Sequence, residues 1–249
     1  MHSRIARWAR QGGLALFLIA SSALSAAAAP VRALPVPPAF DVSDDDVAVS
    51  NAKVKMAYGA LVAMWTADFR QLGARFDAPA ILRYRGNVRT VCGVMQANNA
   101  AYCPDRNAIF FDEVFLARQA KSAARALGTD GDMAAVGIIA HEMGHAVAVQ
   151  LGQDSYVPYE NESTADCLAG AFTQKTAMDG SLEKGDLEEA FFGLAAAGDP
   201  TPQFTGNRRI DARIELRAAL MGHGTREQRL SNFKAGYDDG AGACLPAFR

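Results

Sequence analysis

The chain has 249 residues, of which half are hydrophobic, and a formal net charge of −2 at pH 7 from 25 basic and 27 acidic side chains. A chain of this length can bury a sizeable core as one domain, or as two lobes that share a cleft. Because there is no basic excess, the composition argues against a nucleic acid or an anionic membrane surface as its partner.

The N-terminus has the form of a secretory signal peptide. Arg4, Arg7 and Arg10 precede an apolar run from Gly13 to Ala29 that ends in small residues. We expect residues 1–29 to be removed on export, which leaves 22 basic and 27 acidic residues in a periplasmic or secreted protein. The alternative is an uncleaved N-terminal membrane anchor, because the run approaches the length of a membrane span.

A proline-rich linker at residues 30–42 is expected to precede a single folded domain at residues 43–249. Ser43, followed by three aspartates, predicts the start of a helix. Apolar residues then recur every three or four positions as far as Leu72, and Gly73 predicts the end of this helix.

Between residues 80 and 111 the period changes, and short β-type runs are separated by turn residues such as Gly86 and Pro104. These runs predict a small, mostly antiparallel sheet. A helix is expected from Asp112 or Glu113 to about Leu127.

The next predicted helix, from Met133 to Leu151, carries the sequence His141-Glu142-Met143-Gly144-His145. Histidines four residues apart lie on one face of a helix, about 6 Å apart along its axis, so both rings can bind one ion. The spacing favours one zinc ion bound by His141 and His145. The alternative is that both are core histidines bonded to protein neighbours.

A second helix predicted from about Glu160 offers the rest of a zinc site. Catalytic zinc takes three protein ligands and one water, and Glu162 can be the third ligand. Asp166 lies one turn further on the same face, where it can accept the free ring N–H of a ligand histidine. Otherwise Glu162 and Asp166 are solvated carboxylates in the first turns of a helix.

The remaining C-terminal half is predicted to be helical. Asp186 and Glu189 form a potential capping box for a helix over residues 187–197, and Thr225 and Gln228 form another for a helix to about residue 235. Between them, residues 207–221 carry arginines interleaved with acids, which predicts a surface helix with internal salt bridges. A basic docking site is the alternative for this segment.

Five blocks of the chain carry a resemblance that extends beyond the zinc motif: TVCGVMQANNAAYCPDRNAIFF, HEMGH, ESTADCLAG, LEKGDLEEAFF and HGTREQRLSNFKAGYDDGAGAC. In these blocks the chain resembles the putative neutral zinc metallopeptidases of bacteria. It departs from them in a shortened and altered N-terminal region, in Ala146 where a third histidine is usual, and in an insert at residues 203–222.

The resemblance implies a zincin-like α+β fold, mainly helical, with a small antiparallel sheet beside the HExxH helix. It also implies that an edge strand pairs with the backbone of a peptide substrate. The candidates are the strands flanked by Cys92 and Cys103, or by Asp105 and Asp112.

His223 lies on a glycine turn before the last predicted helix. Related gluzincin peptidases use a late histidine or tyrosine to stabilise a developing oxyanion, so His223 is a catalytic candidate, with Tyr237 as its substitute. A structural role at the start of that helix is the alternative.

Four cysteines in an exported chain predict two disulfides, for which three pairings are possible. We favour Cys92 with Cys103, which closes a short loop, and Cys167 with Cys244, which ties the C-terminus to the ligand helix. Buried free thiols are the alternative.

The expected function is zinc-dependent hydrolysis of peptide bonds in a peptide or protein substrate, with Glu142 as general base for a water activated by the ion. Two rivals remain: an exported peptide-binding or chaperone-like module that keeps the zinc without turnover, and a hydrolase of a non-peptide or cell-wall amide.

Overall fold

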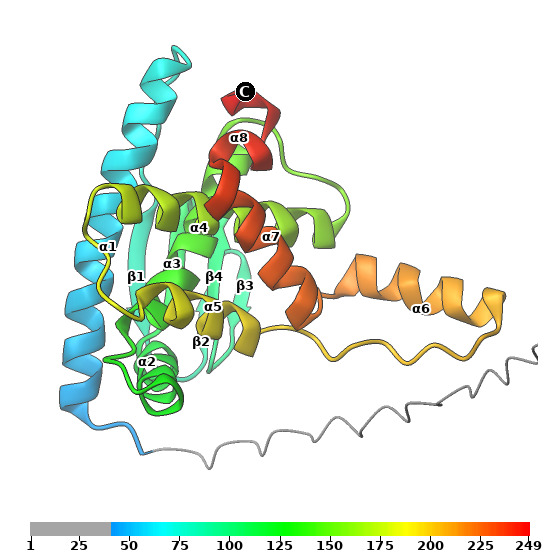
Figure 1. Ribbon diagram of the computed structural model, residues 1–249, viewed down its shortest axis with the longest axis horizontal. Helices are drawn as coiled ribbons and strands as arrows, with labels where there is room; N and C mark the ends of the chain where they lie inside the picture. Colours follow the sequence, from blue (N-terminus) through cyan, green and yellow to red (C-terminus); the bar gives the residue numbers. More distant parts are fainter. Residues whose placement is uncertain (1–40) are drawn as a thin grey trace, which may run out of the picture. The chain divides into compact units, whose positions relative to one another are not determined.

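The computed structural model describes residues 41–249; the signal peptide expected at residues 1–29, and the expected linker apart from its last two residues, lie outside them. The described part is mainly helical and has a small sheet, as in an α+β protein (Figure 1). Its α-helices are α1 (Asp44–Gln71), α2 (Glu113–Leu127), α3 (Asp132–Gln150), α4 (Pro158–Met178), α5 (Asp186–Ala196), α6 (Arg208–Met221), α7 (Arg226–Asp239) and α8 (Ala241–Cys244). Its strands are β1 (Ala80–Tyr84), β2 (Val88–Thr90), β3 (Gly93–Met95), β4 (Ala100–Cys103) and β5 (Ala108–Asp112).

The strands form a three-stranded sheet in the order β1-β5-β4 and a separate β2-β3 hairpin. The pairs β4–β5 and β2–β3 are antiparallel, as expected, but β1 runs parallel to β5, so the expectation of an antiparallel sheet is wrong for that pair. A parallel pair needs a long crossover connection. Here the hairpin and β4 lie within that connection, which no local pattern in the sequence indicates.

Helix α1 begins where the sequence predicts. The side chain of Ser43 accepts a hydrogen bond from the backbone N–H of Asp46, and the Asp46 carboxylate accepts one in return from the backbone N–H of Ser43. One face of α1 then enters the core, where Trp65 is fully buried. The ring of Phe248, near the C-terminus, packs on Trp65 with a centroid separation of 5.6 Å.

Helix α3 lies at the centre of the described part and packs against α1, α2, α4, α5 and the sheet (Figure 1). Nearly every residue from Met133 to Ala148 is buried, as expected of a helix that is apolar all round. The largest fully buried hydrophobic side chains around α3 are Trp65, Phe69, Phe233, Leu61, Ile109, Leu116, Leu168 and Leu194. The HEMGH sequence is therefore fixed in position by the elements that pack around α3.

The capping box expected at Asp186 and Glu189 is wrong. Helix α5 is capped by Gly185 without a side-chain bond, and Glu189 is fully buried. Its two carboxylate oxygens accept hydrogen bonds from the backbone N–H groups of Gly131 and Met133, each at 2.9 Å. Glu189 thus caps α3 from a neighbouring helix, because a carboxylate stabilises the free N–H groups at a helix N-terminus.

Both favoured disulfides are present: Cys92–Cys103 ties the turn between β2 and β3 to β4, and Cys167–Cys244 ties α4 to α8. Disulfides of this kind are typical of proteins outside the reducing cytoplasm. Among residues 41–249, no helix has both the length and the hydropathy needed to cross a membrane.

Candidate metal centre

His141 and His145 lie one turn apart on α3 and point their Nε2 atoms toward the same position. The two Nε2 atoms are 3.1 Å apart, and the rings stand nearly perpendicular with centroids 4.7 Å apart. His141 is buried, at 5% exposure, and the side chain of His145 is 19% exposed. The i, i+4 spacing therefore produces the convergence that the sequence predicts.

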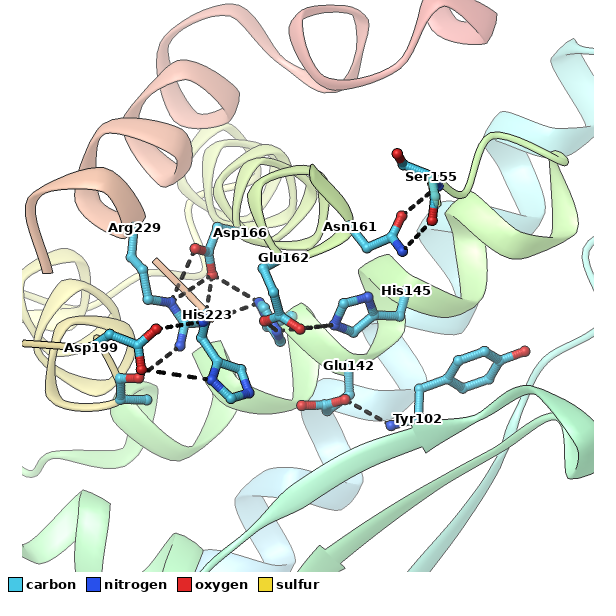
Figure 2. A network of polar contacts seen from close by, with 12 residues as sticks. Tyr102, Glu142, His145, Ser155, Asn161, Glu162, Asp166, Asp199, His223 and Arg229 are labelled. Atoms are coloured by element: carbon cyan, nitrogen blue, oxygen red, sulfur yellow. Dashed lines mark hydrogen bonds and ion pairs between the residues drawn. The ribbon is translucent and has the colours of Figure 1, made fainter. Parts of the chain in front are cut away.

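Glu162 reaches the same position from α4 (Figure 2). Its Oε2 lies 3.2 Å from Nε2 of His141, and its Oε1 lies 3.6 Å from Nε2 of His145. The two helices can approach closely because α3 has glycine at position 144. A Cβ atom there would come within 2.9 Å of the Cα atom and carbonyl oxygen of Ala165 on α4.

These three side chains fit a zinc ion. Ligand atoms at 2.0–2.2 Å from a tetrahedral zinc ion lie about 3.3–3.5 Å from one another. The observed separations of 3.1, 3.2 and 3.6 Å span this range, and Oε2 of Glu162 is buried yet accepts no hydrogen bond of good geometry. Two histidines and a glutamate are also an established ligand set, which leaves a fourth position for water or substrate.

The protonation states suit a metal ligand set. Burial raises the pKa of Glu162, but its contact with His141 and the nearby charges of His145 and His223 lower it to about 2. Burial and the charge on His141 lower the pKa of His145. An ionised carboxylate and a neutral imidazole are the forms that bind a cation.

Asp166, one turn after Glu162 on α4, orients the first histidine. Its Oδ1 accepts a hydrogen bond from Nδ1 of His141 at 2.8 Å. Because an ionised carboxylate cannot donate, the ring proton lies on Nδ1, and the lone pair of Nε2 is left to face Glu162. Burial lowers the pKa of His141, but the charge and hydrogen bond of Asp166 outweigh it and raise this pKa, which makes the ring a more basic ligand for a cation.

Arg229, at the start of α7, completes this network and was missed by the sequence reasoning. Its Nε donates to Oδ2 of Asp166 at 3.0 Å and its Nη2 to Oδ1 at 2.7 Å, while Nη1 donates to the carbonyl of Ala197 at 3.3 Å (Figure 2). Nη2 is also 3.2 Å from Nδ1 of His141, because both groups donate to the same oxygen. A signal did exist: Arg229 precedes Phe233 and Gly236 by four and seven residues, on the buried face of its helix.

Glu142 lies beside the histidines but contacts a different element. Its Oε2 accepts the backbone N–H of Tyr102 on β4 at 2.8 Å (Figure 2). The side chain is 7% exposed. Burial raises the pKa of Glu142 above its ordinary value, although the charge on His141 and the N–H of Tyr102 oppose this. A carboxylate with a raised pKa is suited to accept and return a proton.

Strand β4 presents an open edge to the site. It is the outer strand of its sheet, and the carbonyl of Asn99 accepts the N–H of Asp112 on β5. Hydrogen bonding in an antiparallel pair alternates, so Ala101 and Cys103 also face β5. The backbone groups of Ala100 and Tyr102 therefore point to the open side, where Tyr102 meets Glu142. Of the candidate edge strands, β4 is the one beside the site.

His223 also faces the site, from the turn between α6 and α7 (Figure 2). Asp199 holds this turn: its Oδ2 accepts the backbone N–H groups of His223 at 2.5 Å and Gly224 at 3.2 Å. Its Oδ1 lies 3.9 Å from Nδ1 of His223, whose side chain is 61% exposed. Tyr237 instead packs against the hydrophobic core and does not line the cleft.

A cleft of about 690 Å³ joins these groups. The candidate ligands and Glu142 line it together with β4, His223 and Arg229, and apolar side chains line it as well, among them Phe115, Ile138 and Leu194. The arrangement combines a cation site, a buried base and an unpaired strand edge in one cavity. A cavity that holds a candidate cation site and a buried carboxylate is a candidate active site.

Comparison with known proteins agrees with this chemistry. A model of the family described as "Putative neutral zinc metallopeptidase" matches residues 43–248. The chain is 33% identical over 192 residues to "Uncharacterized protein YpfJ" of Escherichia coli strain K12, and to the protein of the same name in E. coli O6:H1. Each alignment covers 71% of this chain and 63% of the relative, so the chain spans less than two thirds of the length of these relatives.

No solved structure matches the chain. The family model, by contrast, covers α1 to the C-terminal segment and therefore contains every residue of the candidate site. The chain belongs to the family described as putative neutral zinc metallopeptidases.

Proposed function

We propose that this protein is an exported, zinc-dependent peptidase that hydrolyses peptide bonds through a zincin-like site in a domain spanning residues 43–249. The observation that carries the proposal is the convergence of His141, His145 and Glu162 within 4.8 Å of one another. It is supported by the second carboxylate, Glu142, which lies beside them in the same cleft.

His141, His145 and Glu162 are the proposed zinc ligands, and Asp166 fixes the ring orientation of His141. A bound zinc ion supplies a Lewis acid that polarises the scissile carbonyl and lowers the pKa of water to about 7. Every other catalytic task falls to side chains and backbone groups of the chain.

Glu142 is the proposed general base. The N–H of Tyr102 holds Oε2, so Oε1 is the oxygen that accepts the proton of the attacking water and then passes it to the leaving amine. The raised pKa of Glu142 supports the first transfer, because a stronger base takes the proton of the water more readily. His223 is the proposed donor to the oxyanion that forms on the scissile carbonyl.

The substrate is proposed to bind as an extended peptide along β4. On the open side of this strand, the backbone N–H and C=O of Ala100 and the C=O of Tyr102 would pair with its main chain, while the N–H of Tyr102 stays on Glu142. Affinity of this kind depends little on side chains, so we expect cleavage of unstructured proteins of varied sequence. Apolar side chains such as Ile138 and Leu194 in the cleft would favour an apolar residue next to the cleaved bond.

Export is proposed from two features. Residues 1–29 have the pattern of a signal peptide, and residues 30–42 that of a linker. The two disulfides support a periplasmic or secreted location, where thiols are oxidised.

The test compares Glu142→Gln with Glu162→Ala in the purified protein. We expect Glu142→Gln to retain about one zinc per chain while casein cleavage falls by at least about 10³-fold, because the base is lost and the ligands remain. Glu162→Ala should lose both zinc and cleavage. Chelation should abolish wild-type activity, and added zinc should restore it.

Three results would contradict the proposal. Normal cleavage by Glu142→Gln would show that another group is the base. Tight binding of casein peptides without turnover would indicate a binding module. Turnover of cell-wall fragments, with casein untouched, would indicate a different amide substrate.

A further inference from the structure

Helix α6, in the segment at residues 203–222, carries a row of arginines on one face. Arg209, Arg213 and Arg217 are spaced by four residues, so they line up along the helix axis at intervals of about 6 Å. All three are exposed. A row of this kind presents three guanidinium groups to whatever lies beside the helix.

The acids of α6 do not neutralise this row. At 100° per residue, Asp211 and Glu215 fall on the opposite side of the helix from the three arginines. Asp211 instead accepts hydrogen bonds from the N–H and hydroxyl of Thr205 at 2.8 Å. Within residues 41–249, no arginine of α6 forms an ion pair. The expectation of salt bridges within this segment is therefore wrong.

Large apolar side chains are interleaved with the arginines. Leu216 and Leu220 fall on the same side of the helix as the row and are 59% and 48% exposed. Ile214, on the other side, is only partly exposed, and α4 is the main packing partner of α6. The face with arginines and leucines is therefore the one turned away from the body of the protein.

We propose that this face of α6 docks on an anionic lipid surface. Leucines that enter the acyl boundary, with arginines that reach back to anionic headgroups, are the composition of an interfacial helix. An acidic polymer would satisfy the arginines and leave both leucines in water. The proposal depends on local charge: the net charge of the chain argues against such a surface, but it averages over acids that lie elsewhere.

Docking through α6 would also place the cleft near the lipid. Helix α6 ends at Met221, two residues before His223, which lines the cleft. Peptides and proteins at the membrane surface would then be the substrates nearest to the site. This inference goes beyond the proposed peptidase activity and does not depend on it.

The test measures sedimentation of the purified chain with vesicles of phosphatidylglycerol or of phosphatidylcholine. We expect partitioning into the anionic vesicles that falls with added NaCl, and little into the neutral ones. The variant Arg209→Gln/Arg213→Gln/Arg217→Gln should lower the anionic partition coefficient about 100-fold. Leu216→Ser/Leu220→Ser should also weaken binding, whereas a purely ionic contact would not respond.

A matched control removes the same charge elsewhere. Lys55, Arg75 and Arg89 are exposed and form no ion pair within the described residues. The triple substitution of these residues by Gln should leave most of the binding intact, and an equal loss would overturn the proposal. Wild-type binding to anionic vesicles by the α6 arginine variant would overturn the proposal as well.

The wild-type chain should also be tested for dimer formation in solution. If it is a dimer and either α6 variant is a monomer, a second copy of the chain and not a lipid surface occupies this face of α6. Casein cleavage without lipid should be unchanged in every variant.

Discussion

Arg229 and Asp166 form a buried, two-pronged ion pair directly behind a candidate zinc ligand. The side chain of Asp166 is fully buried and that of Arg229 is 4% exposed. An ionised carboxylate at this depth needs a counter-charge, and a neutral imidazole does not supply one. Arg229 therefore supplies this counter-charge and holds Asp166 in place to accept the hydrogen bond from Nδ1 of His141.

Substitution of Arg229 should weaken zinc binding without removal of any ligand. We expect Arg229→Gln to lower zinc affinity about 10–100-fold, because partners of this kind orient the ligands. The free energy of unfolding should fall by about 3–5 kcal/mol, since a buried charge loses its partner. Chelator competition and urea titration measure the two effects. Arg229→Lys keeps the positive charge but not the two-pronged contact, so its zinc affinity and stability should lie between those of the wild type and Arg229→Gln. Wild-type zinc affinity in Arg229→Gln would show that Arg229 does not position the ligand histidine.

Gly144 should be intolerant of any side chain. A Cβ atom would push α3 away from Ala165, and α4 would carry Glu162 with it. We expect Gly144→Ala to lower zinc affinity at least about tenfold, measured by chelator competition. Gly59→Ala on α1 is the matched control, because a Cβ atom there meets nothing within 4 Å. That change should stabilise the fold by about 0.5–1 kcal/mol. Equal zinc affinity in both variants would show that the helix contact does not position Glu162.

His223 and Asp199 should affect turnover and leave the zinc in place. We expect His223→Ala to lower kcat about 10²–10³-fold with zinc content unchanged, as for loss of an oxyanion donor. Asp199→Ala should cause a smaller loss, because the turn loses the acceptor for two backbone N–H groups. Steady-state kinetics with metal analysis separates these effects. Tyr237→Phe should behave as wild type, and a large loss of kcat in that variant would transfer the role to Tyr237.

The two disulfides should differ in their effect on stability. Cys92 and Cys103 are 11 residues apart, and Cys167 and Cys244 are 77 apart. From loop entropy, replacement of the first pair by serines should cost about 3 kcal/mol and of the second about 4.5 kcal/mol in the free energy of unfolding. Denaturant titration of the two double variants gives the comparison. A larger cost for the shorter loop would show that native packing at the hairpin outweighs chain entropy.

The sequence predicts the arrangement of the candidate site wherever two of its residues lie on the same helix. His141 with His145, and Glu162 with Asp166, are each spaced by one turn, so the helix period alone sets their common faces. Arg229 was missed because it lies 63 residues from Asp166, and only the packing of α7 on α4 joins them. An arginine in the first turns of a helix otherwise resembles a solvated residue.

The fold shows the same division between local and distant effects. The capping box at Thr225 and Gln228 is present because both of its bonds lie within four residues. Glu189 has the same local signature, yet it caps α3 instead. The backbone N–H groups of Gly131 and Met133 are buried and have no partner within their own helix, so they need an acceptor from another element. Strand direction has no signature at all, which is why the parallel β1–β5 pair could not be anticipated.

The hydrogen bond from Tyr102 to Glu142 has a second consequence, for solubility. An outer strand as apolar as β4 is a template for pairing with other copies of the same sheet. One of its outward N–H groups is already engaged by a side chain from α3, so a second sheet cannot continue an unbroken ladder along it. The carboxylate of Glu142, which we propose as the general base, therefore also opposes aggregation of the protein through the edge strand β4.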